Sequence, residues 1–315
     1  MNNQKKAQYW NPLLIGNEES RFNPLVNPIF ETLNNKYLDD KELGELFAKI
    51  DTINTMKNES CSPLLLEAIK KEKLRTLIEN SDAIDYNVTD ILGNTAAHVV
   101  TNIDDMELLY KSVKGHLDVS KYFNQRNNNQ ETPLYHAAEI ASDSGNKDIL
   151  NFMLDPNKGI NADVNAEDKD NYTVLHMCLL QRKKGIEKER NDQVIEILLK
   201  YGANPNASNS RNITPAHYAA KFHNFEVLQV FLSGKIKANV NAQNEDGNTP
   251  LHYAIIPNYN NELERNKVVD LLIANGADLT LKNNKGLTPI EHIEQKSGKI
   301  ASENFLKHLK NPIRD

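Results

Sequence analysis

One short motif recurs along the chain at nearly constant spacing, and this recurrence constrains the fold more than any other feature. Its clearest versions read TPLYHAA, TPAHYAA and TPLHYA. Copies or near copies begin at Ser62, Thr95, Thr132, Thr173, Thr214, Thr249 and Thr288, at intervals of 33, 37, 41, 41, 35 and 39 residues. A period of this length indicates a solenoid, in which each repeat buries its apolar faces only against its neighbours.

The residue types of the motif suit a helix that begins at the threonine. Threonine serves as N-cap, and proline suits the first helical position, where its missing N–H costs nothing. Small residues such as Ala219 and Ala220 let helices stack closely. An apolar stripe at helical spacing follows, as in Val194 and Leu198, and Gly202 then ends that helix where φ is positive. Each repeat is therefore predicted to be a pair of helices.

A second signature lies between the motif copies. It reads NADVNA, GANPNA, KANVNA and NGADL, and the next motif begins eight to ten residues after its Asp or Asn. The two signatures together resemble the ankyrin repeat, which has a period of 33 residues and the motif T-P-L-H-x-A. The resemblance covers residues 57–296 as six to seven irregular repeats. It implies an all-α solenoid of helix–turn–helix pairs with β-turn fingers.

Two inserts stretch the regular period. The copy that opens at Thr173 has about eight extra residues within 181–192, and the copy at Thr249 has about six within 256–266. We expect both inserts to lengthen the corner between the two helices of the repeat, because surface loops absorb added residues at small cost.

Two other copies are irregular in a different way. The copy at Thr132 is expected to take about four extra residues in its corner and about four more after its second helix, in 155–159. In the copy at Thr95, residues 104–113 keep phase as the predicted second helix. Residues 115–123 look more like the second helix of the family, although they lie too far along the chain for the regular phase of the repeat. They are the alternative second helix.

Both ends of the chain depart from the motif. Residues 41–53 read as an amphipathic helix and 27–38 as a shorter one. We interpret 1–56 as a helical cap that shields the first repeat, with a small functional module as the alternative. Residues 297–315 are predicted to form the C-terminal cap and tail, with the closing helix at 301–310.

No segment carries a known catalytic motif of the HExxH, GxSxG, P-loop or GxGxxG type. Histidines at the H of the motif are His98, His176, His217 and His252. The resemblance implies that they bond the motif threonine and the neighbouring turn. We therefore predict no enzyme activity, no catalytic residue, no cofactor and no metal. An enzyme with its chemistry in residues 1–56 is the alternative, although 56 residues are few for a site with its own core.

Composition narrows the class of protein further. The net charge of −6 argues against a nucleic acid partner, and no run of 18 apolar residues could span a membrane. The N-terminus lacks the apolar region of a signal peptide, and two cysteines 117 positions apart form no disulfide framework, so we expect a cytoplasmic protein. We also expect it to be a monomer. Asparagine is common, with 43 residues. A turn-dense fold would accommodate them, and an AT-rich coding sequence would also explain them.

The resemblance implies a protein partner, gripped by the finger tips and inner helices. Carried over position by position, the candidate contacts are Lys169, Asp170, Tyr172 and Leu180, then Arg211, Ile213, Lys221 and Phe222, then Glu245, Asp246 and Asn248. Tyr172, Arg211, Ile213 and Phe222 are of the large or hot-spot type, at positions that the fold leaves exposed. They lie on two adjacent repeats and predict a central binding patch.

Two further hypotheses follow from the resemblance. Asn- and Lys-rich ankyrin proteins with irregular repeats and an unusual N-terminal segment look like effectors that intracellular bacteria inject into eukaryotic hosts. The protein would then act in the host cytosol, and a non-secreted cytosolic scaffold is the alternative. Asn206 occupies the loop position that host asparaginyl hydroxylases modify in ankyrin folds, so it is a candidate for hydroxylation.

Overall fold

The computed structural model describes residues 41, 45, 64–70, 73–79, 84–181, 186–256 and 262–310. The chain packs as two compact units, Met1–Tyr122 and Phe123–Asp315. The predicted helices at 27–38 and 41–53 lie outside the described residues, apart from Lys41 and Glu45, which are helical. The interpretation of 1–56 as a cap stays a prediction.

The described part of the first unit contains two helix pairs. Its helices are α3 (Leu64–Lys70), α4 (Leu74–Glu79), α5 (Ala96–Val99), α6 (Ile103–Lys114) and α7 (Val119–Phe123), the last of which reaches the boundary of the unit. Helix α3 packs on α4 and α5, and α6 packs on both of these. The prediction that 104–113 form the second helix is confirmed, and 115–123 contain the additional short helix α7.

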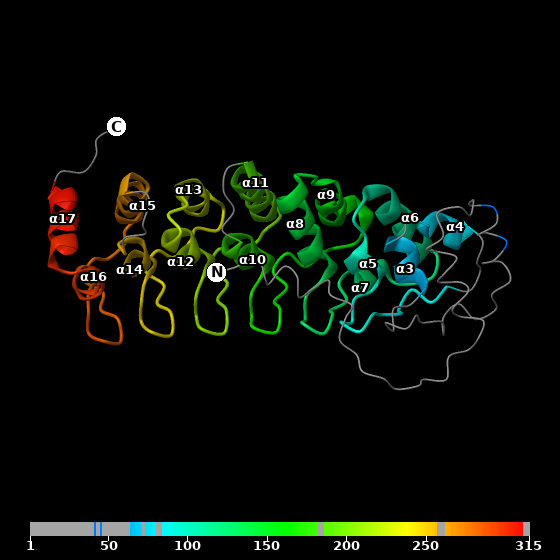
Figure 1. The fold of residues 1–315 in the computed structure, drawn as a ribbon, viewed down its shortest axis with the longest axis horizontal. Coiled ribbons are helices and arrows are strands. Elements are labelled where there is room, and N and C mark those ends of the chain that lie inside the picture. Colours follow the sequence, from blue (N-terminus) through cyan, green and yellow to red (C-terminus); the bar gives the residue numbers. More distant parts are fainter. Residues whose placement is uncertain are drawn as a thin grey trace, which may run out of the picture. The chain divides into compact units, whose positions relative to one another are not determined.

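The second unit continues the same pattern with five helix pairs within its described residues. They are α8 (Pro133–Ser144) with α9 (Asp148–Leu154), α10 (Val174–Leu180) with α11 (Ile186–Lys200), α12 (Pro215–Lys221) with α13 (Phe225–Ser233), α14 (Pro250–Ala254) with α15 (Glu262–Ala274), and α16 (Pro289–Ser297) with α17 (Lys299–Lys310). A 3₁₀ turn, η2 (Pro156–Lys158), follows α9. First helices pack on first helices, with the fingers on one side and the second helices on the other (Figure 1). The prediction of an all-α solenoid is confirmed. Helix α17 covers the predicted helix at 301–310, and its role as a C-terminal cap stays a prediction.

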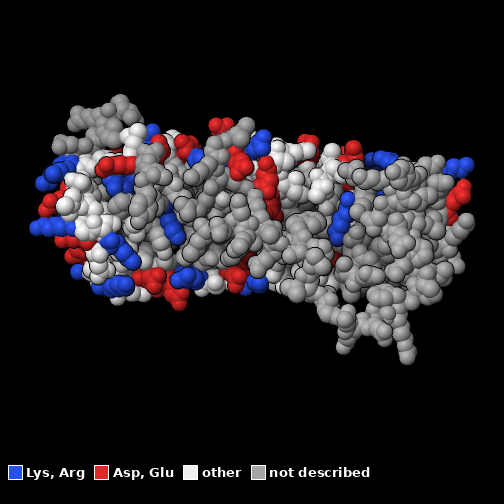
Figure 2. Space-filling model, viewed as in Figure 1, with Lys and Arg blue, Asp and Glu red and all other residues white. Residues whose placement is uncertain are grey.

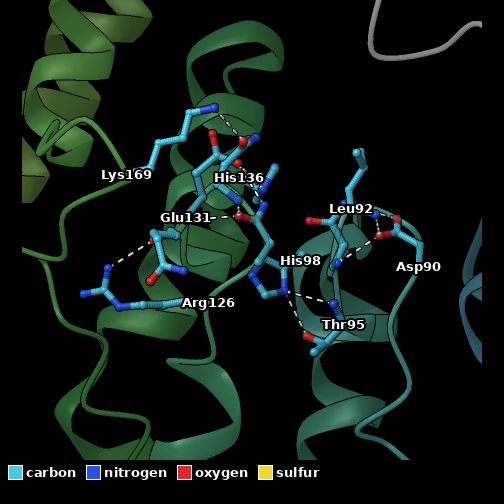
Figure 3. A network of polar contacts seen from close by, with 12 residues as sticks. Asp90, Leu92, Thr95, His98, Arg126, Glu131, His136 and Lys169 are labelled. Carbon is cyan, nitrogen blue, oxygen red and sulfur yellow. Dashed lines mark hydrogen bonds and ion pairs between the residues drawn. The ribbon is translucent and has the colours of Figure 1, made fainter.

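The motif threonine and histidine form one hydrogen-bonded unit. In the Thr214 repeat, the Thr214 backbone N–H donates to Nδ1 of His217 at 3.1 Å, and the two side chains lie 2.8 Å apart. The same contacts recur at Thr95–His98, Thr173–His176 and Thr249–His252, and Figure 3 shows the first of these. Threonine thus caps the helix while histidine closes the reciprocal bond, as in a capping box.

The other ring nitrogen of the histidine reaches the next repeat. Because Nδ1 accepts from a backbone N–H, the ring proton must lie on Nε2. Nε2 of His176 donates to the carbonyl of Ile213 at 3.0 Å, and His217 donates likewise to Asn248 at 3.0 Å. Burial lowers the pKa of both His176 and His217 to about 4. These histidines are neutral links between repeats, and the predicted bonds to the motif threonine and to the next turn are present.

Each finger is a turn closed by one Asn or Asp side chain. In the Thr214 repeat, Oδ1 of Asn209 accepts from the backbone N–H groups of Arg211 and Ile213, at 2.9 and 3.0 Å. Asp90, Asn127, Asp168, Asn244 and Asn283 make the equivalent pair of bonds. Neighbouring tips of the second unit are then joined by single backbone bonds, such as Glu245 N–H to the Arg211 carbonyl at 3.0 Å. The fingers are therefore ordered and mutually supported.

A row of asparagines joins the loops that follow the second helices. Asn206 donates through Nδ2 to the Lys237 carbonyl at 2.8 Å and accepts at Oδ1 from the Asn239 N–H at 2.7 Å. Asn165 and Asn241 make the same two bonds to the loops after them. Together with the finger turns, this row accounts for many of the asparagines, which favours the turn-dense explanation of the composition.

The inserts differ from the prediction. Helix α11 begins at Ile186 and α15 at Glu262, so residues 186–192 and 262–266 of the two ranges lie in longer second helices. Residues 182–185 and 257–261 lie outside the described part of the chain. In the Thr132 repeat, the first helix α8 continues to Ser144, and φ is +81° at Gly145, where it ends. The physical reason is composition, because residues 186–192 are rich in strong helix formers.

Candidate protein-binding surface

The candidate contact residues lie on the side of the second unit that carries its fingers and first helices, here called the finger face. The exposed ones are Lys169, Asp170, Leu180, Arg211, Lys221, Glu245 and Asp246. Tyr172, Phe222 and Asn248 are half-buried. The structure thus leaves ten of the eleven candidates at least partly open to solvent.

Ile213 is the exception, and its predicted exposure is wrong. It is only 9% exposed. Its carbonyl accepts from His176 and its N–H donates to Asn209. Ile213 is therefore part of the packing between repeats and not of a contact surface.

Four rings from two repeats form one cluster on the finger face. Tyr218 stacks on Phe222, with ring centroids 6.1 Å apart and an interplanar angle of 16°. The hydroxyls of Tyr172 and Tyr218 lie 3.3 Å apart. The ring of His176 packs edge-on against Tyr172 at 5.6 Å and against Tyr218 at 6.2 Å. The half-buried rings of Tyr172 and Phe222 are thus held in place from below.

The cluster extends to the next repeat through Lys221 and Tyr253. The Lys221 ammonium lies 5.5 Å from the ring centroid of Phe222 and 5.9 Å from that of Tyr253. Asn244, which closes the finger of that repeat, donates to the Tyr253 hydroxyl at 2.9 Å. We call Tyr172, Tyr218, Phe222, Lys221 and Tyr253 the aromatic patch.

Tyr218 and Tyr253 were not among the predicted contacts. Both occupy the variable position of the T-P-L-H-x-A motif, directly after the motif histidine. The signal was present in the copies TPAHYAA and TPLHYA, where the same large aromatic residue recurs at that position. Tyr218 is only 6% exposed, so it supports the patch more than it offers surface.

The exposed finger-tip candidates carry charges of both signs, since Lys169 and Arg211 are basic and Asp170, Glu245 and Asp246 are acidic. Acidic and basic groups lie next to one another along the edge that the finger tips form (Figure 2). Nε of Arg211 lies 4.0 Å from a carboxylate oxygen of Glu245, with the side chains 65% and 68% exposed. Such an exposed pair contributes little to stability, so both groups are available to a partner.

Comparison with protein families decides what the repeats are. Residues 185–283 match the family model for three copies of the ankyrin repeat, and residues 129–169 match the model for a single ankyrin repeat. The chain contains ankyrin repeats over these two ranges. The Thr–His links, the turn-closing asparagines and the fingers described above are thus features of its ankyrin repeats.

Relatives of the ankyrin-repeat chain come from several organisms. A fowlpox virus protein named as an ankyrin repeat protein is 28% identical over 151 residues, which are 48% of this chain and 18% of the relative. A Dictyostelium discoideum protein named as a serine/threonine-protein kinase is 33% identical over 205 residues, 65% of this chain and 22% of the relative. A platypus protein named for ankyrin repeat, SAM and basic leucine zipper domains is 37% identical over 90 residues, 29% of this chain and 16% of the relative. The chain thus spans less than a quarter of each relative.

The described residues show two further facts that bear on the site. Among them, no three His, Cys, Asp or Glu side chains come close enough together to hold a metal ion. No helix in the described ranges has the length and apolar character to cross a membrane. The amide nitrogen and the amide oxygen of Asn206 both form hydrogen bonds to the loop of the next repeat, which explains why asparagine recurs at this position. The hydroxylation of Asn206 stays a prediction.

Proposed function

We propose that the protein binds a partner protein through the finger face, with the aromatic patch as the energetic centre. Ankyrin repeats are protein–protein interaction modules, so the coarse function follows from the family. The observation that supports this location is the ring cluster of Tyr172, Tyr218 and Phe222, which spans two repeats. Binding hot spots are enriched in tyrosine and arginine and lie in well-packed surroundings.

The surroundings of the patch fit this role. The exposed Leu180 and the half-buried Tyr172 and Phe222 supply apolar contact area. Arg211 and Glu245 supply rim charges on adjacent finger tips. Because the rings are already fixed by His176 and by each other, a partner would lose little side-chain freedom on binding.

Replacing Tyr172, Arg211 and Phe222 by alanine together is expected to abolish partner capture. Loss of two aromatic anchors and one arginine removes several kcal/mol of binding, because single hot-spot truncations cost about 2 kcal/mol or more. Capture is measured by affinity purification with quantitative mass spectrometry, at a temperature well below the unfolding midpoint of each variant.

The matched control replaces Glu196, Lys200 and Tyr201 by alanine, all exposed on or directly after the second helix α11. This control should capture the partner as the parent chain does. Equal capture by the patch variant and the parent would contradict the proposal, provided that circular dichroism shows both to be folded.

The hypothesis that the protein is an effector delivered into a host cell stays a prediction. The ring cluster and finger tips bear on binding and not on delivery. A reporter enzyme fused to the full chain would test it, with delivery into host cells expected only when the secretion system of the source cell is intact.

A further inference from the structure

The insert in the Thr173 repeat contacts the repeats on both sides of it. Its described part, Ile186–Asp192, forms the first two turns of α11. On one side, Arg190 donates to the Asp143 carbonyl at the end of α8 at 3.1 Å. On the other side, Lys188 pairs with Glu226 of α13 at 3.0 Å. One short helical segment therefore contacts three consecutive repeats.

The contact with the first helices is buried. Asn191 is 5% exposed; its Nδ2 donates to the carbonyl of Cys178 in α10 at 2.9 Å. Its Oδ1 accepts from the hydroxyl of Ser142 in α8 at 3.0 Å, and Ser142 is fully buried. Buried bonds of this kind are costly to break, because an orphaned partner would be left without water. The segment thus fixes α8 and α10 against each other.

The contact with the following repeat reaches the corner that presents Phe222. Asp192 accepts from Nδ2 of Asn224 at 2.9 Å, and Lys188 lies 2.6 Å from the same carboxylate. Asn224 is the N-cap of α13 and lies two residues after Phe222. Between them, His223 has φ of +54°, in the left-handed region that non-glycine residues seldom adopt. This corner is therefore a strained turn held by its neighbours.

We propose that Lys188, Asn191 and Asp192 are positioning residues for the aromatic patch. Through Asp192 and Asn224 they fix the corner that carries Phe222, and through Asn191 they fix the helix that carries Leu180. The segment Ile186–Asp192, here called the clasp, lies on the side of the second helices and holds the binding surface rigid. The role of these residues in partner binding rests on the proposed function, whereas their effect on the corner that carries Phe222 does not.

The test is hydrogen–deuterium exchange of the full chain, which requires no partner. In the double variant Lys188→Ala with Asp192→Ala, here called the clasp variant, backbone amides of residues 222–226 are expected to exchange at least tenfold faster than in the parent chain. Amides of α16 should be unchanged, because the clasp does not contact that repeat. The single variant Asp192→Asn keeps an acceptor for Asn224, and it should restore slow exchange at 222–226.

The matched control replaces Glu187 and Glu189, exposed residues on the same two turns, by alanine. It should exchange as the parent does. Unchanged exchange at 222–226 in the clasp variant would overturn the proposal. Faster exchange throughout the second unit would also overturn it, because the segment would then serve general stability and not the position of the corner.

Partner capture separates this inference from the proposed function. If the patch binds a partner, the clasp variant should release it at least five times faster, although every patch residue is intact. Should the parent capture nothing while the exchange result holds, the proposed function fails and the positioning of the corner stands. Should capture by the clasp variant equal that of the parent, the corner does not need the clasp for binding.

Discussion

Lowering the pH from 7.5 to 5 is expected to reduce the free energy of unfolding by about 4 kcal/mol through His176 and His217 alone. Burial lowers the pKa of each ring to about 4, and both residues are at most 1% exposed. In the unfolded chain the pKa of histidine returns to about 6.5. Between pH 6.5 and 4, the unfolded state therefore binds protons that the folded state does not.

The contribution of these two histidines to the free energy of unfolding therefore rises with pH across this window and is complete above pH 6.5. Each ring accounts for about 2 kcal/mol of the loss at pH 5, because a shift of one pKa unit is worth about 1.4 kcal/mol. Burial also lowers the pKa of His252 and of His223, which acts in the same direction. Protonation at Nδ1 would further place a donor against the backbone N–H of the motif threonine.

Urea unfolding followed by circular dichroism at several pH values measures this effect. The variant His217→Gln removes one titrating group, so its drop should be smaller by about 2 kcal/mol, and it should be less stable than the parent at pH 7.5. The variant His116→Gln alters an exposed histidine and should keep the full drop. A midpoint for the parent chain that is constant from pH 7.5 to 5 would show that these histidines are not buried neutral links.

Gly247→Ala is expected to destabilise the protein by about 3 kcal/mol, and Gly286→Ala by only about 1 kcal/mol. Both glycines occupy the same position of their fingers, with φ of +75° and +74°. At Gly286 an added Cβ would meet no atom within 4 Å, so the left-handed backbone is the only cost. This makes Gly286 a matched control for conformational strain.

At Gly247 the added Cβ would lie 2.7 Å from the backbone nitrogen of Asn284 and 2.6 Å from its Oδ1. That nitrogen donates to the carbonyl of Asp246 at 2.9 Å and joins the two finger tips. The alanine must push the next finger away, so the bond between tips is lost in addition to the strain. Unfolding midpoints of the two variants measure the difference, and equal losses would mean that the fingers do not approach closely.

The sequence was sufficient to predict the repeats because each motif residue has a local task. Thr214 caps its helix, His217 closes the cap and reaches the next repeat, and Asn209 closes the finger turn. These roles depend on spacing within one repeat and recur in phase, so single-chain patterns reveal them. The position of the left-handed residue, two before the threonine, also repeats, and it holds glycine, asparagine or glutamine.

What the sequence could not reveal depends on contacts between repeats. Ile213 occupies a position that often faces a partner, but here it is only 9% exposed, and its burial depends on the repeats around it. The regular period predicts that about eight residues within 181–192 lengthen the corner, although the composition of 186–192 favours a helix. The clasp contacts of Asn191 with Ser142 and Cys178 join residues 49 and 13 positions apart. No local pattern encodes such a pairing.

Site-specific photo-crosslinking tests the central claim, that the finger face binds a protein partner, most directly. A photoreactive phenylalanine analogue replaces Phe222 in one chain and Tyr201, exposed beyond the end of α11, in another. Excess unlabelled parent chain should compete for the partner, whereas the patch variant should not. The account predicts a discrete protein adduct from position 222 that the parent chain suppresses, and none from 201. An adduct of equal or greater yield at position 201 would contradict it.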